Sequence, residues 1–180
     1  MIETGRLVLR PMVEDDRPWF LGQTRDAEVM ALLGGVQPPE LANAKFDYMR
    51  GLFAQHGFTF WLMVTKSGGD RIGICGLKTF DSPGAPQLAG ALEIGWRLNV
   101  PWWGKGYARE AAVASLDHAF GAIGGTLVYS ITSDRNVASW GLMERLGMTR
   151  RRDLDFVDPR FAPEDNPTIV YSIEADIWRT

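Results

Sequence analysis

A glycine-containing turn between a strand pattern and a helix pattern constrains this sequence more than any other feature. Residues 91–98 alternate in the way typical of a strand with one buried face, and residues 107–120 look helical. The connecting turn, residues 99–108, reads N-V-P-W-W-G-K-G-Y-A. The first turn of a helix leaves backbone N–H groups without intrahelical partners, and glycine lets an anion approach them closely. The turn therefore predicts a corner that binds phosphate.

Two nucleotide-binding motifs fail when they are tested against this turn. A Walker loop has the pattern G-x-x-x-x-G-K-[ST], but Asn99 occupies the position of its first glycine and Gly106 that of its hydroxyl residue. A dinucleotide-binding turn has the pattern G-x-G-x-x-G/A, and Arg109 stands where its third small residue belongs. A nucleotide-dependent enzyme of the Rossmann type is therefore only an alternative.

Hydrophobic periodicity along the rest of the chain predicts a mixed α/β fold in one domain, residues 1–180. Runs 58–66 and 71–80 are separated by a Ser-Gly-Gly-Asp turn and indicate a β-hairpin. Asp15 and Asp16 are of a residue type that caps helices. The other expected strands are 4–10, 91–98, 126–132, 148–157 and 168–178, and the expected helices follow Asp16 or lie at 40–55, 107–120 and within 133–147.

Composition argues against several classes of protein. A net charge of −3 and a pI near 5.4 disfavour a protein that binds nucleic acid through electrostatics. The single cysteine, Cys75, excludes an intrachain disulfide, and two histidines leave little material for a transition-metal site. No apolar run reaches the roughly 18 residues of a membrane span, and the first residues do not resemble a secretory signal. We therefore expect a cytoplasmic protein with no metal and with neither nucleic acid nor membrane as a partner.

Together with two further motifs, the turn resembles the GNAT superfamily of acetyl-CoA-dependent N-acetyltransferases. The family pattern [Q/R]-x-x-G-x-[G/A] places Gly106 and Ala108 at its two small positions and Trp103 at its Gln/Arg position, where this chain departs from it. The segment L-E-I-G-W-R-L resembles the family's fourth strand, and N-V-A-S-W-G-L-M-E-R-L-G-M its later N-x-x-S helix. The variant W-G-K-G-Y-A is similar to the branch of ribosomal-protein N-terminal acetyltransferases.

The resemblance implies a central, mostly antiparallel sheet that splays between two parallel strands, with helices on both faces. It implies acetyl-CoA as the cosubstrate, its pantetheine arm lying between the splayed strands. The backbone near Leu98 would polarise the thioester carbonyl. The residues that the resemblance assigns to cofactor binding are Trp96, Leu98, Val100, Trp103, Gly104, Lys105, Gly106, Tyr107, Ala108, Asn136 and Ser139.

The helix that follows residue 133 carries two polar candidates. Asp134 or Asn136 can cap its N-terminus. Ser139 shares the i, i+3, i+4, i+7 spacing of the apolar residues in 142–146, so it is expected on the inward face. The resemblance implies that Asn136 binds the pantetheine arm and that Ser139 lies near the sulfur, as a hydrogen-bond donor or an acid for the thiolate.

Acetyl transfer to an amine requires a group that takes a proton from the amine and a donor for the thioester oxygen. Glu93 is the best candidate base, because it faces away from Leu92 and Ile94 in the strand that leads to the turn. Partial burial would raise the pKa of its carboxyl. The alternatives for Glu93 are an ordinary exposed carboxylate or a partner of Arg97.

These observations predict an acetyl-CoA-dependent N-acetyltransferase whose acceptor is a primary amine, on a protein N-terminus or on a small molecule. The principal alternative is a CoA-binding sensor or scaffold without catalysis, which would keep the turn and Asn136 but need no base. Because many family members pair through sheet edges, the resemblance also implies a possible homodimer.

Overall fold

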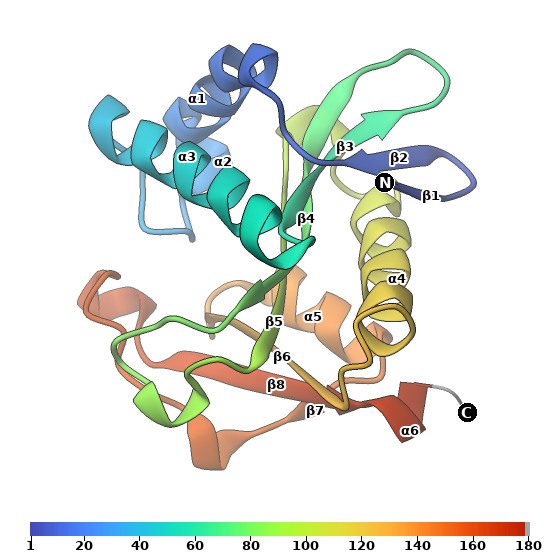
Figure 1. Ribbon diagram of the computed structural model, residues 1–180. Coiled ribbons are helices and arrows are strands. Elements are labelled where there is room, and N and C mark those ends of the chain that lie inside the picture. Colours follow the sequence, from blue (N-terminus) through green and yellow to red (C-terminus); the bar gives the residue numbers. More distant parts are fainter. Residues whose placement is uncertain (179–180) are drawn as a thin grey trace.

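In residues 1–178, which the computed structural model describes, eight strands form one sheet (Figure 1). The strands are β1 (Ile2–Glu3), β2 (Leu7–Arg10), β3 (Phe60–Thr65), β4 (Arg71–Thr79), β5 (Leu92–Leu98), β6 (Leu127–Ser133), β7 (Thr149–Arg150) and β8 (Thr168–Glu174). Their order is β1-β2-β3-β4-β5-β6-β8-β7, and all neighbours are antiparallel except β5 and β6. The predicted mixed α/β fold is confirmed, and a doubly wound parallel sheet of the Rossmann type is excluded.

Helices cover both faces of this sheet. They are α1 (Arg17–Arg25), α2 (Ala27–Met30), α3 (Pro39–His56), α4 (Tyr107–Phe120), α5 (Val137–Arg145) and α6 (Ala175–Trp178). In Figure 1, α1–α3 group to one side of the strands and α4 lies on the other. Within residues 1–178, no helix combines the length and apolar character needed to cross a membrane.

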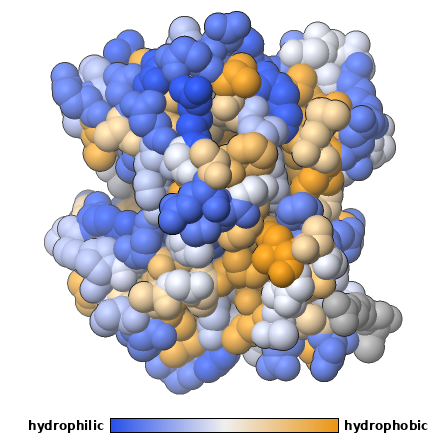
Figure 2. Space-filling view, in the orientation of Figure 1, coloured by the Kyte–Doolittle hydropathy of each residue, from blue (hydrophilic) through white to orange (hydrophobic). Residues whose placement is uncertain are grey.

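The alternation of side chains along β3 explains the two layers of helices. Trp61 and Met63 belong to the core that α4 and α5 close, whereas Leu62 packs with Phe20 of α1 and Phe46 of α3. Successive side chains of a strand point to opposite faces, so an apolar run such as this one needs cover on both. On the molecular face shown in Figure 2, polar side chains predominate and apolar ones gather towards the middle.

Three predicted strand ends are wrong by several residues. Thr4 lies in a turn where its Oγ1 accepts a hydrogen bond from the N–H of Leu7, so β2 begins only at Leu7. β8 stops at Glu174, where the chain enters α6. Of the predicted strand 148–157, Thr149–Arg150 pair with β8, a short 3-10 helix follows, and Phe156 returns to β8 in a single bridge with Thr168. Local alternation predicted strand character in these segments but not whether a neighbouring strand was present to pair with.

Asp16 stands at the N-cap position of α1 as the sequence predicts, but its side chain does not cap that helix. Its fully buried carboxylate accepts hydrogen bonds from Arg10 at 2.7 and 2.9 Å, from Arg71 at 2.8 Å and from the N–H of Val13 at 2.9 Å. Burial alone would raise the pKa of Asp16, but the donors outweigh it and the pKa is lowered. This carboxylate therefore ties β2, β4 and the start of α1 together.

The two parallel strands separate soon after they meet. β5 pairs with β4 along its whole length, but with β6 only at Leu92 opposite Val128 and Glu93 opposite Tyr129. Beyond that point Ser130 Oγ still donates a hydrogen bond of 3.0 Å to the carbonyl of Ile94. The splay expected from the resemblance is therefore present, and it opens toward the turn that follows β5.

Candidate active site

The turn after β5 owes its shape to two glycines. Gly104 and Gly106 have φ angles of +70° and +78°, in the left-handed region that residues with a Cβ rarely adopt. A Cβ built on Gly104 would meet no atom within 4 Å, and one on Gly106 would lie 3.5 Å from Nη2 of Arg6. The space in front of the turn is therefore open to a ligand that approaches the backbone.

The backbone N–H groups of this turn are available to such a ligand. The first hydrogen bond of α4 runs from the N–H of Glu110 to the carbonyl of Gly106 at 3.1 Å, and no side chain caps the helix. Within the described part of the chain, the N–H groups of residues 104–109 have no hydrogen-bond acceptor. Unpaired N–H groups at a helix N-terminus favour an anion, which is the requirement of a pyrophosphate site.

Arg6, in the turn between β1 and β2, contacts the glycine turn, and the sequence did not predict this contact. Its Nε lies 2.6 Å from Oε2 of Glu110, its Nη1 donates to the carbonyl of Lys105 at 3.0 Å, and its guanidinium lies 4.2 Å from the centre of the Tyr107 ring. Glu110 would otherwise repel an anion at the helix N-terminus. Although burial opposes it, hydrogen bonds from Thr4 and Arg6 lower the pKa of Glu110, and Arg6 balances its charge.

Trp103 reaches back from the turn to the end of β5. Its indole Nε1 donates a hydrogen bond of 2.8 Å to the carbonyl of Leu98, although the ring is 45% exposed. The N–H of Asn99 bonds to Ile72 of β4, so the Leu98 carbonyl, which points the opposite way, faces the splay. The Leu98 carbonyl therefore accepts a hydrogen bond from the Trp103 indole. That the backbone near Leu98 polarises a thioester carbonyl stays a prediction.

The N-terminus of α5 lies at the same end of the sheet as the glycine turn, because β5 and β6 are parallel. Asn136 caps this helix through its Oδ1, which accepts the N–H of Ser139 at 3.3 Å. Its Nδ2 has no acceptor among residues 1–178. Ser139 is half-buried, and the apolar residues that share its stripe, Leu142, Met143 and Leu146, are buried as predicted.

Glu93 lies on the opposite face of β5 from Ile94, which packs in the core beneath α4. The side chain is buried, and Lys78 Nζ lies 3.0 Å from its Oε2, an oxygen that receives no well-directed hydrogen bond from the described residues. Burial raises the pKa of Glu93, and the charge of Lys78 offsets part of this effect. The two alternatives for Glu93, an exposed carboxylate and a partner of Arg97, are both wrong, because the side chain is buried and its ion-pair partner is Lys78.

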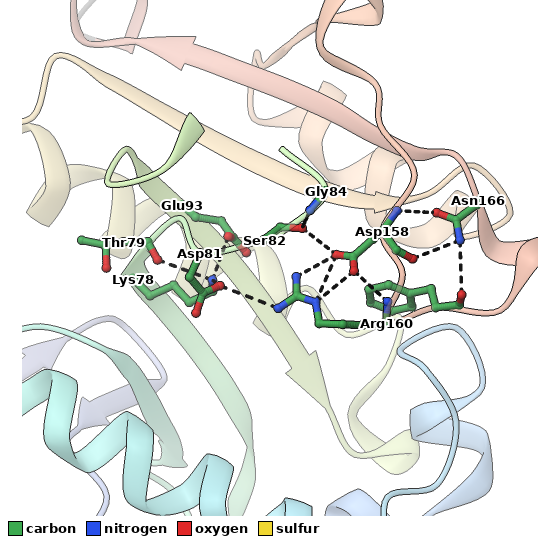
Figure 3. A network of polar contacts seen from close by, with 10 residues as sticks. Lys78, Thr79, Asp81, Ser82, Gly84, Glu93, Asp158, Arg160 and Asn166 are labelled. Carbon is green, nitrogen blue, oxygen red and sulfur yellow. Dashed lines mark hydrogen bonds and ion pairs between the residues drawn. The ribbon is translucent and has the colours of Figure 1, made fainter. Parts of the chain in front are cut away.

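Lys78 connects Glu93 to a polar network of residues from distant parts of the sequence (Figure 3). Its Nζ donates to Asp81 at 2.5 Å, and Asp81 also accepts from the hydroxyl of Tyr48 at 2.9 Å. Arg160 lies 3.8 Å from Asp81. The other members of the network are Thr79, Ser82, Gly84, Asp158 and Asn166.

Arg97 projects from the same face of β5 as Glu93 and reaches α1 and α2. Its Nε donates to Oε1 of Gln23 at 2.8 Å, and its Nη1 lies 3.6 Å from the sulfur of Met30. The guanidinium carbon stands 5.0 Å from the centre of the Phe20 ring, and Nη2 is buried without an acceptor. Burial lowers the pKa of Arg97 to about 10.

The single cysteine and the two histidines lie away from the glycine turn or in the core, where they have structural contacts. Cys75 is buried beside Ser115, and burial raises the pKa of its thiol to about 12. His118 packs edge-to-face on Trp61 with ring centres 5.3 Å apart. His56 is the last residue of α3. In residues 1–178, no group of three or more His, Cys, Asp or Glu side chains is arranged to hold a metal ion.

Comparison with known proteins agrees with this geometry. Residues 6–149 match the acetyltransferase (GNAT) domain family, so the chain belongs to this family and is an N-acetyltransferase. The FsC-acetyl coenzyme A-N(2)-transacetylase of Aspergillus fumigatus is 26% identical over 190 residues, which cover 98% of this chain and 77% of that protein. The Bacillus subtilis protein YkkB, uncharacterized by its name, is 27% identical over 146 residues, or 81% of this chain and 83% of its own.

Solved structures share the fold over almost the whole chain. An acetyltransferase from Agrobacterium tumefaciens is 27% identical with a TM-score of 0.79, and the match covers 96% of this chain and 93% of that one. A spermidine N-acetyltransferase from Vibrio cholerae, in complex with CoA and spermine, is 15% identical with a TM-score of 0.75, covering 97% and 98%. A candidate ribosomal-protein-serine acetyltransferase from Vibrio cholerae is 18% identical with a TM-score of 0.69, covering 96% of each chain, so the likeness to that branch is loose.

Proposed function

We propose that this N-acetyltransferase takes its acetyl group from acetyl-CoA and transfers it directly to a primary amine. The observation that carries this proposal is the turn after β5, where the N–H groups of residues 104–109 have no acceptor in the described chain. These donors and the open space before Gly104 fit a pyrophosphate. The residues that would contact the donor in this turn and along the end of β5 are Trp96, Leu98, Val100, Trp103, Gly104, Lys105, Gly106, Tyr107 and Ala108.

The splay between β5 and β6 would hold the pantetheine arm. The pairing of the two strands ends at Glu93. The N–H of Asn99 points toward β4, and backbone groups alternate in direction along a strand, so those of Trp96 and Leu98 point toward the gap. An extended arm with amide groups can bond to such a strand edge as an additional strand does. Asn136 would contribute its free Nδ2 from the other side of the gap.

Acetyl transfer then needs a proton acceptor and a donor near the sulfur. Glu93 would take the proton of the amine, directly or through a water, because burial gives its carboxylate a raised pKa closer to neutral pH. Ser139 would donate a hydrogen bond to the departing thiolate. The bound thioester supplies the activated acetyl group, so no covalent intermediate on the enzyme is required. The buried position of Glu93 favours catalysis over the alternative of a CoA-binding sensor.

The test has two stages. Thermal unfolding is first measured with acetyl-CoA, CoA and NAD, and acetyl-CoA is expected to raise the melting temperature while NAD does not. Release of free thiol is then followed with a panel of amines that includes peptides with free N-termini, polyamines and amino acids. Thiol release with one acceptor class supports the proposal. Binding of acetyl-CoA with no acetyl transfer to any acceptor would favour the sensor, and preference for NAD would overturn the donor site.

A further inference from the structure

The guanidinium of Arg97, whose Nη2 is buried, has no counter-ion among residues 1–178. Its Nε bonds to the neutral amide of Gln23, its Nη1 faces the thioether of Met30, and its buried Nη2 has no acceptor. Gln23 is itself held by a hydrogen bond of 2.6 Å from its Nε2 to Oδ1 of Asn99. Every polar contact of Arg97 in residues 1–178 is therefore with a neutral group.

Other buried charges in this protein have partners of opposite sign. Asp16 binds Arg10 and Arg71, and Asp158 binds Arg160 through both carboxylate oxygens. Glu93 faces Lys78. A buried ion without a counter-ion is strongly unfavourable, so proteins pair such groups or keep them for a ligand. The π face of Phe20 stabilises the Arg97 cation but does not cancel its charge.

A second cation lies on the same side of the sheet. Lys45 of α3 is half-buried and has no ion-pair partner among the described residues. Burial lowers its pKa, and the positive charges of Arg97 and Arg160 lower it further. Arg160 is already neutralised by Asp158, but Arg97 and Lys45 are not.

The position of Arg97 relates this region to the reacting groups. Arg97 and Glu93 are four residues apart on one face of β5, so their Cα atoms lie about 13 Å from each other. Just beyond Met30, Leu32 and Leu33 line a cavity of about 50 Å³ with Ile131–Ser133 of β6, Phe161, Asp165 and Thr168. Met30, whose sulfur lies 3.6 Å from Nη1 of Arg97, precedes Leu32 by two residues in the chain.

We propose that the acceptor of this enzyme is an amine that also carries an anionic group, a carboxylate or a phosphate, and that Arg97 binds this group with Lys45 beside it. The proposal rests on the proposed function, since it assigns the acceptor of the same site. The separation of Glu93 and Arg97 places the anionic group several bonds from the amine. The phosphate groups of acetyl-CoA are the other anions that Arg97 could bind, but the expected binding site of the pyrophosphate is the turn at residues 104–109, where α4 begins.

Matched acceptors test the proposal. The wild-type enzyme is assayed with ω-amino acids of increasing length and with the corresponding ω-amino carboxamides, which differ only in charge. A pair of short peptides with glutamate or glutamine after the first residue extends the series. We expect kcat/KM to be at least about tenfold higher for the carboxylate of the best pair, because a charged hydrogen-bond partner discriminates strongly against a neutral one. Equal values across every pair would overturn the proposal.

Two substitutions assign the preference to this site. In Arg97→Gln, the ratio of kcat/KM for the carboxylate to kcat/KM for the carboxamide is expected to fall to about one. In Arg97→Lys, most of the preference for the carboxylate is expected to remain. Arg151→Gln changes the net charge equally at a surface pair with Asp153 and is expected to leave the ratio unchanged. Circular dichroism and thermal unfolding confirm that each variant is folded, and Lys45→Met gives an independent second test if Arg97→Gln does not fold.

The outcomes separate this proposal from the proposed function. If acetyl-CoA does not bind, or if no amine releases thiol, the proposed function fails. If thiol is released without any preference for an anionic acceptor, only the present proposal fails. A rise in KM for acetyl-CoA in Arg97→Gln, with an unchanged preference among acceptors, would place the anion on the donor and overturn it.

Discussion

Lys78 and Glu93 form an ion pair at 3.0 Å in which the carboxylate is buried and the ammonium also bonds to Asp81. Burial raises the pKa of Glu93, and the adjacent positive charge offsets part of this rise. The protonation state of the candidate base is therefore set by a residue of the neighbouring strand, which pairs with Glu93 in the β4–β5 register.

Lys78→Met is expected to move the acidic limb of the pH profile of kcat/KM to higher pH, by roughly one unit. The sign follows because the amine is deprotonated by the ionised form of Glu93, and removal of a positive charge makes this form harder to reach. Lys78→Arg keeps the charge and is expected to retain most of the wild-type profile. Glu93→Gln is expected to lower kcat by about 10²-fold or more while acetyl-CoA binding persists. An unchanged acidic limb in Lys78→Met would show that Glu93 is not the titrating base.

Gly104→Ala is expected to weaken acetyl-CoA binding by about tenfold or more. The new methyl group would stand in the open space where an anion approaches the amides, and the φ of +70° adds a backbone strain of roughly 1 kcal/mol. Gly69→Ala is the matched control, because Gly69 also has φ +70° and open space around its Cβ, but lies in the β3–β4 hairpin. Both variants should lose similar stability in thermal unfolding, and only the first should lose affinity in calorimetry. Equal affinities would remove the turn from the donor site.

The two functions proposed for Asn136 can be separated by two substitutions. Asn136→Ala removes the cap of α5 and is expected to cost about 1 kcal/mol of stability. Asn136→Asp keeps an oxygen for the N–H of Ser139 but loses the Nδ2 donor, so stability should remain near that of the wild type. We expect weaker acetyl-CoA binding in both variants. Normal binding by Asn136→Asp would leave Asn136 with the capping function alone.

Cys75 is expected to resist alkylation in the folded protein. Its thiol is buried, and a pKa of about 12 leaves roughly one molecule in 10⁴ as thiolate at pH 8. Treatment with iodoacetamide followed by mass spectrometry should show an unmodified protein, whereas the same treatment in denaturant should add one group. Rapid modification under native conditions would contradict this burial and show that β4 opens readily.

The mixed sheet, the order of most elements and the glycine turn could be predicted because each depends on short-range patterns. The alternation in residues 91–98 and the glycines at 104 and 106 need only neighbouring residues to be recognised. The errors occurred where the outcome depended on residues or strands that are distant in the sequence. Alternation continues past Glu174, but among residues 1–178 no neighbouring strand extends the ladder there. Asp16 has the chemistry of a cap, yet two arginines bind it in the interior.

The candidate site shows the same division. The sequence alone determined the family resemblance, the position of the glycine turn and the place of Glu93 in the strand that leads to it. Only the tertiary structure decided that Lys78 and not Arg97 is the partner of Glu93 and that Arg6 contacts the glycine turn. It also decided that the Arg97 guanidinium has no counter-ion among the residues that the structure describes. Contacts between side chains that are tens of residues apart depend on strand register and helix packing. A local pattern of hydrophobicity determines neither the register nor the packing.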